Sequence, residues 1–419
     1  MTDGAVAEDE RTPPRPVWRT ALLGWAIAFV ALFVLVRWGG RGPFAGYGGV
    51  DPAGYPGSSL FGGWFRFDGN WYALIASRGY WLDSVDVQGP VAYFPAYPAV
   101  LWAVHAITGV SVKLLASIVT IVCGAGALVA IFRWLNDRLE DRVAKVAFVT
   151  LLVYPYVFYL FGAAYGDALF LLAAVVAFLL LERDHPVLAG LAGALATATR
   201  PVGIALIVGL VAVALWRRHA VERRDGHRLP RLEWRRLRPA DAGVLLSVGG
   251  LVGYMTYLGV RFGHPFAFDE VQRAQGWDQG SGPRTWFKIT WFQQAKNLPR
   301  WVWDWVQHGD AATFEKVQYA VTVLLQGALV LGFCVLAVLV WKRLGWGYGL
   351  YCAAMLAIAL LGTKDFQGTG RYLLALFPCF AVLGQLLADR PRLRWGWWIV
   401  SAALLATWAF AFGRGYYVA

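Results

Sequence analysis

The sequence has few charged residues, few cysteines and few histidines, and each shortage excludes a class of protein. Only 15% of the 419 residues are charged and 58% are hydrophobic, whereas an average soluble domain carries about 25% charged residues. The four cysteines form no CxxC pair and the six histidines form no HExxH motif, so neither a disulfide framework nor a zinc site is expected. A metal site built by this protein would need carboxylates.

The hydrophobic residues gather in long runs. Several runs approach the roughly 20 apolar residues that a helix needs to cross a bilayer, and the mean hydropathy is positive. We therefore predict an all-α polytopic membrane protein with about 11 transmembrane helices. The predicted spans are 18–36, 114–131, 146–161, 168–181, 187–199, 202–216, 242–260, 319–341, 346–362, 372–388 and 395–413.

Two of these runs, 187–199 and 202–216, are short and are separated by Arg200–Pro201. Proline disfavours helix at the residue before it and breaks the helical hydrogen-bond ladder. We predict a tight turn between two short helices, with one kinked span as the alternative.

The spans divide the chain into regions. These are a cytoplasmic tail (1–17), a transmembrane module (18–261) that includes a first external loop (37–112), a second external loop (262–318) and C-terminal transmembrane helices (319–419). The tail is too long and acidic for the n-region of a signal peptide, so the first span is expected to be a retained anchor. Both long loops are expected to carry interfacial helices. The stretch 96–108 is apolar for only about a dozen residues, too few to span, and the tryptophans of the second loop are typical of an amphipathic helix in the headgroups.

The net charge of +12 lies mostly in short loops, where the positive-inside rule accounts for it without a nucleic-acid partner. With the N-terminus in the cytoplasm, the short and mostly basic loops fall inside and the two long loops outside. Asp68, Asp167, Arg200 and the segment 364–371 then share the outer face. Charges at membrane level are costly and usually functional.

The stretch 64–80, WFRFDGNWYALIASRGY, concentrates such residues. It places Asp68 between Arg66 and Arg78 among six aromatic residues, a composition that suits the membrane–water interface. One hypothesis makes Asp68 the catalytic base of a membrane glycosyltransferase. The alternative is an interfacial loop in which Asp68 merely pairs with an arginine.

Five motifs in order support the first hypothesis. They are FDGNWYALIASRGYW with YFPAYP, YPYVFYLFGAAYGDALF, TATRPVG, FGHPFAFDEVQRAQGW and GTGRYLLALFPCF. From about residue 20 to 390, the chain resembles the PIG-V-type mannosyltransferases of the GT-C superfamily, which makes the transmembrane module GT-C-like. It departs from the family pattern at Asp167, where glutamate is expected, and at His264, where an acidic residue is more usual. The order of the YP helix and the G-x-Y-x-D turn also looks like oligosaccharyltransferase catalytic subunits.

The resemblance implies a function. A polyprenyl- or dolichyl-phosphate sugar, most often mannose, would be the donor, and a hydroxyl of a glycolipid, glycan or protein would be the acceptor. Asp68 would take the acceptor proton, a role typically worth about 10²–10⁴-fold in rate. Arg200 and Arg371 would stabilise the leaving phosphate, since the arginine fork donates two hydrogen bonds to it. Composition rich in Ala, Arg and Gly suggests a bacterial plasma membrane, with membrane lipids as further partners.

The roles of the other candidates are less defined. Asp167 would position the acceptor, support Arg200, or join Asp68 around a divalent metal ion; the resemblance implies no metal or other cofactor. The remaining candidate substrate-binding residues are Arg66, Trp71, Tyr72, Gln272, Trp277 and Tyr372. The alternative function is a lipid or sugar transporter or flippase, although no convincing internal repeat is present. A third reading is a non-catalytic partner in a membrane assembly.

Overall fold

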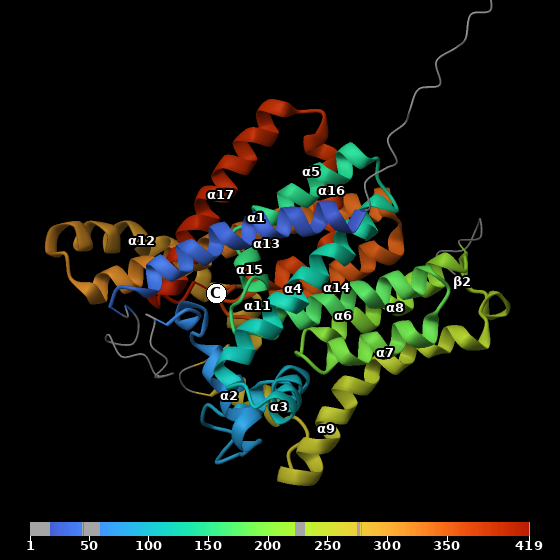
Figure 1. Ribbon diagram of the computed structural model, residues 1–419, viewed down its shortest axis with the longest axis horizontal. Helices are drawn as coiled ribbons and strands as arrows, with labels where there is room; N and C mark the ends of the chain where they lie inside the picture. Colours follow the sequence, from blue (N-terminus) through green and yellow to red (C-terminus); the bar gives the residue numbers. More distant parts are fainter. Residues whose placement is uncertain are drawn as a thin grey trace, which may run out of the picture.

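Figure 1 shows a computed structural model of the chain, which describes residues 17–43, 45, 59–222, 231–274, 277 and 279–418. The predicted cytoplasmic tail therefore lies outside the described residues, except for Val17. The α-helices are α1 (Val17–Gly40), α2 (Asp68–Arg78), α3 (Ala96–Thr108), α4 (Val112–Asn136), α5 (Asp141–Leu152), α6 (Asp167–Glu182), α7 (Pro186–Thr197), α8 (Gly203–Arg217), α9 (Gly249–Phe262), α10 (Ala267–Glu270), α11 (Gly282–Trp286), α12 (Ile289–His308), α13 (Ala311–Leu344), α14 (Trp346–Gly362), α15 (Thr369–Tyr372), α16 (Phe377–Ala388) and α17 (Pro391–Arg414).

Several short elements join these helices. The 3-10 helices include η4 (Val157–Leu160), η6 (Pro239–Val248), η7 (Val271–Arg273) and η8 (Leu373–Ala375). Two-residue strands β1 (Val221–Glu222) and β2 (Arg231–Leu232) form an antiparallel pair in the basic loop between α8 and η6.

The prediction of an all-α polytopic membrane protein is confirmed. Within the described residues, five helical stretches are long and apolar enough to cross a membrane: α1, α4, η6 with α9, α13 and α17. The bent pair formed by α15–η8 and α16 would make a sixth.

The predicted count of about 11 spans is not confirmed. Four of the expected spans, α6, α7, α8 and α14, are helices of 16, 12, 15 and 17 residues, shorter than the roughly 20 residues of a typical span. Proline divides two others. α5 ends at Leu152, shortly before Pro155, so the run 146–161 is not one helix. The run 372–388 bends by 81° between η8 and α16. Pro378 lies in the first turn of α16, where proline is tolerated, but it cannot continue the preceding helix.

Other local predictions agree with the structure. α7 and α8 are separate short helices, and Arg200 and Pro201 lie in the turn between them. α3 covers the predicted stretch 96–108, and α12 forms in the second long loop with no buried residue. That these two helices lie in the membrane interface stays a prediction.

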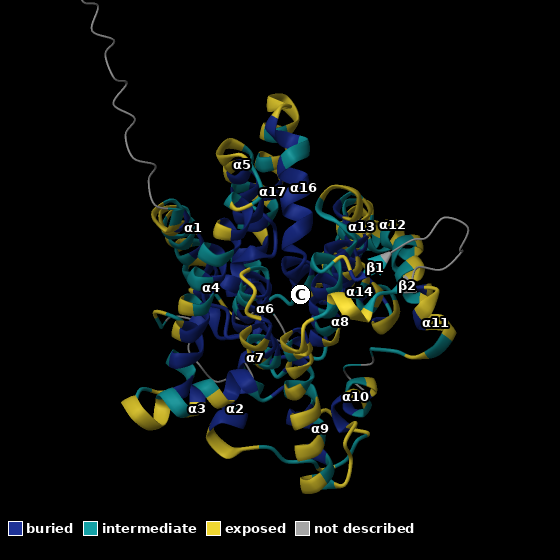
Figure 2. Ribbon diagram, turned by 90° about the vertical axis from the view of Figure 1, so that its right-hand side faces the viewer, coloured by how far each residue is buried: buried dark blue, intermediate teal, exposed yellow. Residues whose placement is uncertain are grey.

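The interior and the outer faces differ in the way expected of a protein in lipid. Figure 2 shows α16 almost wholly buried, and most residues of α6 are buried too. By contrast, Leu23, Ile27 and Val30 of α1 are each more than 60% exposed. Apolar patches of this kind are costly in water but match a hydrocarbon solvent.

Charged loops meet at one end of the helices. Arg138 after α4 pairs with Glu182 at the end of α6, and Arg142 of α5 lies 3.1 Å from Asp389. In Figure 1 the β2 hairpin lies at the right, beyond α8, whereas α12 lies at the far left. Asp167, the first residue of α6, lies at the end of this helix that is remote from these loops.

Candidate active site

Two carboxylates of the site open helices. Asp68 is the first residue of α2 and Asp167 is the first residue of α6. The N-terminus of a helix carries partial positive charge, which favours a carboxylate there. Phe67, directly before Asp68, has φ +49°, a conformation that costs a non-glycine residue about 1–3 kcal/mol and is concentrated at functional sites. The positive φ of Phe67 places this residue outside the helical conformation, and α2 begins at the next residue, Asp68.

Close packing brings the two helix ends together. A Cβ atom on Gly69 would lie only 2.9 Å from the Cβ of Ala164. Glycine at this position lets the start of α2 approach the turn that leads into α6.

An alternating chain of charges connects four elements of the fold. Nη1 of Arg371, in α15, lies 3.0 Å from Oδ2 of Asp68 and 3.8 Å from Oδ2 of Asp167. Arg200, from the turn between α7 and α8, forms a salt bridge to Asp167. All four side chains are at most 17% exposed. Each buried charge therefore has an opposite charge beside it, as burial requires.

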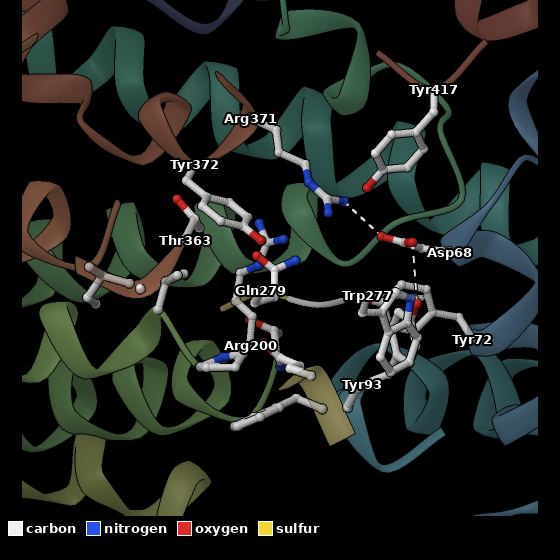
Figure 3. Close-up of a pocket in the computed structure, with 18 residues that line it drawn as sticks. Asp68, Tyr72, Tyr93, Arg200, Trp277, Gln279, Thr363, Arg371, Tyr372 and Tyr417 are labelled. Carbon is white, nitrogen blue, oxygen red and sulfur yellow. Dashed lines mark hydrogen bonds and ion pairs between the residues drawn. The ribbon is translucent and has the colours of Figure 1, made fainter. Parts of the chain in front are cut away.

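Tyrosines lie around these four charged residues. The hydroxyl of Tyr93 donates to Oδ1 of Asp68 at 3.3 Å, as drawn in Figure 3. Burial raises the pKa of Tyr93 well above its usual value, so the phenol stays protonated and able to donate. The guanidinium of Arg200 lies 4.7 Å from the ring centre of Tyr372, within the range of a cation–π contact.

All of these residues except Asp167 line a cavity of about 180 Å³. Figure 3 shows Arg371 and Tyr417 on one side of Asp68, and Tyr93 and Trp277 on the other. The ring of Trp277 packs edge-on against Tyr93 and Trp71, with centroids 5.8 and 5.9 Å apart. The polar and aromatic residues of the lining are Asp68, Tyr72, Tyr93, Phe94, Thr199, Arg200, Gln272, Trp277, Gln279, Thr363, Arg371, Tyr372 and Tyr417.

Most candidates from the sequence meet at this cavity. Asp68, Tyr72, Arg200, Gln272, Trp277, Arg371 and Tyr372 line it. Asp167 lies behind Arg200 and Arg371, and Trp71 packs behind Tyr93 and Trp277. Arg66 is the exception, because it does not line the cavity. Its Nη2 donates to the carbonyl of Gly413 at 3.0 Å, so it connects the approach to α2 with the end of α17.

Six of the polar and aromatic lining residues were missed by the sequence reasoning, and two of them, Phe94 and Thr199, belong to the YFPAYP and TATRPVG motifs. Tyr93 belongs to the YFPAYP motif, and Thr363 directly precedes the segment 364–371, so both carried a usable signal. Gln279 follows the motif of the second loop, which ends at Trp277. Tyr417 comes from the segment after α17, and nothing near it in the sequence indicates a site.

The two carboxylates converge on a guanidinium. Asp68 and Asp167 both direct an oxygen at Nη1 of Arg371. Within the described part of the chain, no group of three or more histidine, cysteine or acidic residues is arranged to hold a metal ion. The guanidinium of Arg371 thus lies between the two carboxylates that one alternative joins around a divalent ion.

Solved structures that are similar to this chain include three with the following names. ArnT from Cupriavidus metallidurans, bound to undecaprenyl phosphate, has a TM-score of 0.49 at 17% identity, covering 93% of this chain and 64% of that one. The oligosaccharyltransferase of Archaeoglobus fulgidus in complex with zinc and sulfate scores 0.47 at 15% identity, covering 94% and 53%. The archaeal oligosaccharyltransferase AglB with an inhibitory peptide and a dolichol-phosphate scores 0.47 at 13% identity, covering 95% and 56%.

This chain thus spans between about half and two thirds of the length of those chains. No protein-family model and no curated protein matches it. Function is therefore inferred from the site, and the assignment to PIG-V-type mannosyltransferases remains a proposal.

Proposed function

We propose that this protein is a GT-C-type membrane glycosyltransferase. It transfers a sugar, most simply mannose, from a polyprenyl- or dolichyl-phosphate donor to an acceptor hydroxyl of a glycolipid or glycan. The observation that carries the proposal is the buried series Asp68–Arg371–Asp167–Arg200 beside a cavity, at one end of an apolar helix bundle. The choice of mannose rests on the sequence motifs that resemble PIG-V-type enzymes.

Asp68 is the proposed catalytic base. As the acceptor oxygen attacks the anomeric carbon, its proton passes to the carboxylate of Asp68 and the bond from carbon to phosphate oxygen breaks. The attack comes from the face opposite the leaving group, so the anomeric configuration inverts. Tyr93 holds Oδ1 of Asp68 by a hydrogen bond, which directs the carboxylate toward the cavity.

Arg371 is the proposed partner of the leaving phosphate. In this structure it neutralises Asp68 at 3.0 Å, and a phosphate in the cavity would compete with that carboxylate for the guanidinium. Donor binding would thereby release Asp68 to act as base. The Nε atom of Arg371 is buried and has no hydrogen-bond partner among the described residues, so it would donate to a bound phosphate only after the guanidinium turns toward the cavity.

Asp167 and Arg200 form the supporting pair. The salt bridge to Asp167 and the ring of Tyr372 hold Arg200 in place at the cavity wall. Arg200 can therefore add a second cation for the phosphate, while Asp167 limits the net charge of the site. Trp277, Gln272 and Gln279 line the same cavity and supply a ring and two amides for the sugar.

We also propose that the cavity opens on the extracytoplasmic face of a bacterial plasma membrane, with the N-terminus in the cytoplasm. The cluster of basic loops at the opposite end of the helices supports this orientation through the positive-inside rule. Accessibility labelling of single cysteines placed at Asp83 and at Arg343 tests it. Labelling from outside should reach the first position and not the second.

The proposed reaction is tested with a radiolabelled polyprenyl-phosphate mannose in membranes that contain the full chain. Membranes without it are the control, and the anomeric configuration of the product is determined. We expect transfer only where the protein is present, with inversion. Retention of configuration would contradict the mechanism, and transport of the donor without transfer would favour the alternative below.

A transporter or flippase is the second candidate, and one observation favours it. A break separates the α15–η8 segment from α16, and the two are bent by 81°. Broken helices at a charged site are typical of transporters. Movement of the labelled lipid across proteoliposomes, measured with and without acceptor, separates the two functions.

A further inference from the structure

A second cavity, of about 490 Å³, lies at the other end of α6 from the candidate active site. α6 runs from Asp167 to Glu182 and is 16 residues long, which corresponds to about 24 Å at 1.5 Å per residue. The two cavities therefore lie at opposite ends of one buried helix. The second is lined by Asp137, Arg138, Leu179, Glu182, Arg183, Trp216, Arg217 and His219.

Both carboxylates of the second cavity are neutralised within the protein. Glu182 forms a salt bridge to Arg138 and accepts a hydrogen bond from the hydroxyl of Tyr348. Asp137 lies 2.9 Å from Nε of Arg133. Neither carboxylate is left to balance a further positive charge.

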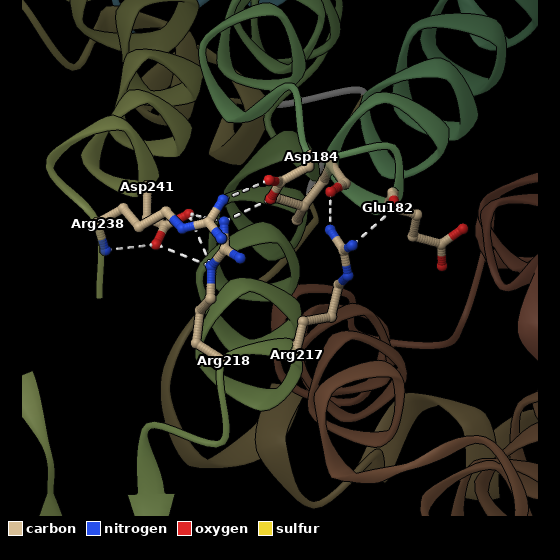
Figure 4. A network of polar contacts seen from close by, with 7 residues as sticks. Glu182, Asp184, Arg217, Arg218, Arg238 and Asp241 are labelled. Carbon is tan, nitrogen blue, oxygen red and sulfur yellow. Dashed lines mark hydrogen bonds and ion pairs between the residues drawn. The ribbon is translucent and has the colours of Figure 1, made fainter. Parts of the chain in front are cut away.

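Two arginines of the cavity have no acidic partner among the described residues. Arg217 donates only to backbone carbonyls, those of Leu181 and, at 2.7 Å, Glu182. Figure 4 shows the carboxylate of Glu182 directed away from Arg217. Arg183 is exposed, and its side chain contacts no acid within the described ranges. Counted over the described residues, the cavity thus presents an excess of about two positive charges, with His219 also in its lining.

A neighbouring network holds this arrangement in place. Arg218 bridges Asp241, at 2.9 Å, and Asp184, and Arg238 reaches Asp184 at 2.6 Å. Figure 4 shows these contacts joining the end of α8 to the turn between α6 and α7. The acids of this network are engaged by Arg218 and Arg238, so they do not neutralise Arg217 or Arg183.

We propose that the second cavity binds the phosphate of an anionic phospholipid headgroup. The planar guanidinium donates paired hydrogen bonds to phosphate oxygens, and Arg217 and Arg183 supply two such groups. Leu179 and Trp216 give the same cavity an apolar part that suits the glycerol region of a lipid. Basic pockets between helices at a membrane surface are the sites where anionic headgroups bind. This site is separate from the proposed transfer reaction, and its test does not depend on that activity.

The test measures the apparent melting temperature of the full chain in detergent. The probes are phosphatidylglycerol and phosphatidylcholine in mixed micelles, and inorganic phosphate alone. We compare wild type with the double variant Arg183→Gln/His219→Gln and with Arg217→Gln. Arg343→Gln is the matched control, because Arg343 is exposed, bonds only the amide oxygen of Gln385 among the described residues and lies outside the cavity.

Phosphatidylglycerol should raise the melting temperature of wild type and of Arg343→Gln more than phosphatidylcholine does. The double variant should lose at least half of that rise, even if Arg217→Gln proves too unstable to purify. An equal rise in wild type and the double variant, or no rise in wild type, would overturn the proposal. A rise with inorganic phosphate and none with phosphatidylglycerol would overturn the lipid as the source of the phosphate.

Discussion

At the scale of single residues, the site depends on Arg371 more than on any other side chain. Its guanidinium lies between the carboxylates of Asp68 and Asp167, which open two different helices. A buried charge that loses its partner destabilises a protein by about 3–5 kcal/mol. Arg371 therefore has a structural and a proposed catalytic role, and a test must separate them.

Arg371→Lys separates these roles because it keeps the charge and loses the planar fork. We expect the variant to fold, since one ammonium still faces the carboxylates. Its turnover number for sugar transfer should fall by roughly 10²–10³-fold, the effect of losing one donor to charge that develops in a transition state. Initial rates at saturating donor measure this. A turnover number within a few-fold of wild type would show that the fork of Arg371 is not used.

Lys288 gives a prediction about pH. It lies outside the spans, is 7% exposed, and donates to the carbonyls of Ala359 and Thr363, the latter residue lining the cavity. Burial lowers the pKa of Lys288 to about 8, while the nearby charge of Asp365 opposes that shift. In an unfolded chain the pKa of lysine is about 10.4. Between these values the unfolded chain holds a proton that the folded chain has released.

Folding stability contributed by Lys288 should therefore rise with pH between about 8 and 10.4. The measurement is the apparent melting temperature of wild type and Lys288→Met across this range. The difference, wild type minus variant, should grow as pH increases. A difference that shrinks over the same range would mean that the lysine is held in its charged form.

At the scale of elements, the site depends on how closely α2 approaches α6. Asp68 can reach Arg371 because Gly69 leaves no side chain between α2 and Ala164. Neither helix is long, and neither would hold its carboxylate in place alone. The geometry of the charges is thus a property of helix packing.

Gly69→Ala should disturb this packing without breaking any ion pair directly. The added Cβ, 2.9 Å from that of Ala164, forces a shift, and overpacking of this kind costs about 1–3 kcal/mol. Misplacement of a reacting group by about 1 Å lowers rates by around 10²-fold, so transfer should fall markedly. Gly396→Ala in α17 is the control, since nothing lies within 4 Å of its added Cβ. Equal transfer by both variants would contradict the role of this contact.

At the scale of the whole molecule, several candidate residues from the sequence motifs lie at one cavity, whereas the number of spans predicted from hydropathy is not confirmed. Asp68, Arg200 and Arg371 come from separate motifs, and the structure brings them to one cavity. The break at Arg200–Pro201 was predictable because proline acts on its immediate neighbours. The break is a local effect, and the three residues are charges in otherwise apolar sequence. Both kinds of feature can be recognised in the sequence.

The features that were missed depend on contacts between distant parts of the chain. Arg66 donates to the carbonyl of Gly413, 347 residues away, and Tyr417 reaches the cavity from beyond α17. The bend before α16 was missed for a different reason, because hydropathy shows only a continuous apolar run there although Pro378 lies at the break. No periodicity in the sequence encodes such pairings.

The most direct test of the central claim is the initial rate of mannose transfer by Asp68→Asn. Wild type and Asp83→Asn, which removes an exposed carboxylate from the same loop, are measured beside it at matched expression. EDTA is added in a parallel series. The proposed mechanism predicts full transfer by wild type and Asp83→Asn, no change with EDTA, and a loss of about 10²–10⁴-fold in Asp68→Asn, the contribution of a general base. Transfer by Asp68→Asn at the wild-type rate would contradict Asp68 as the base, and loss with EDTA that Mg²⁺ or Mn²⁺ restores would contradict a metal-free site.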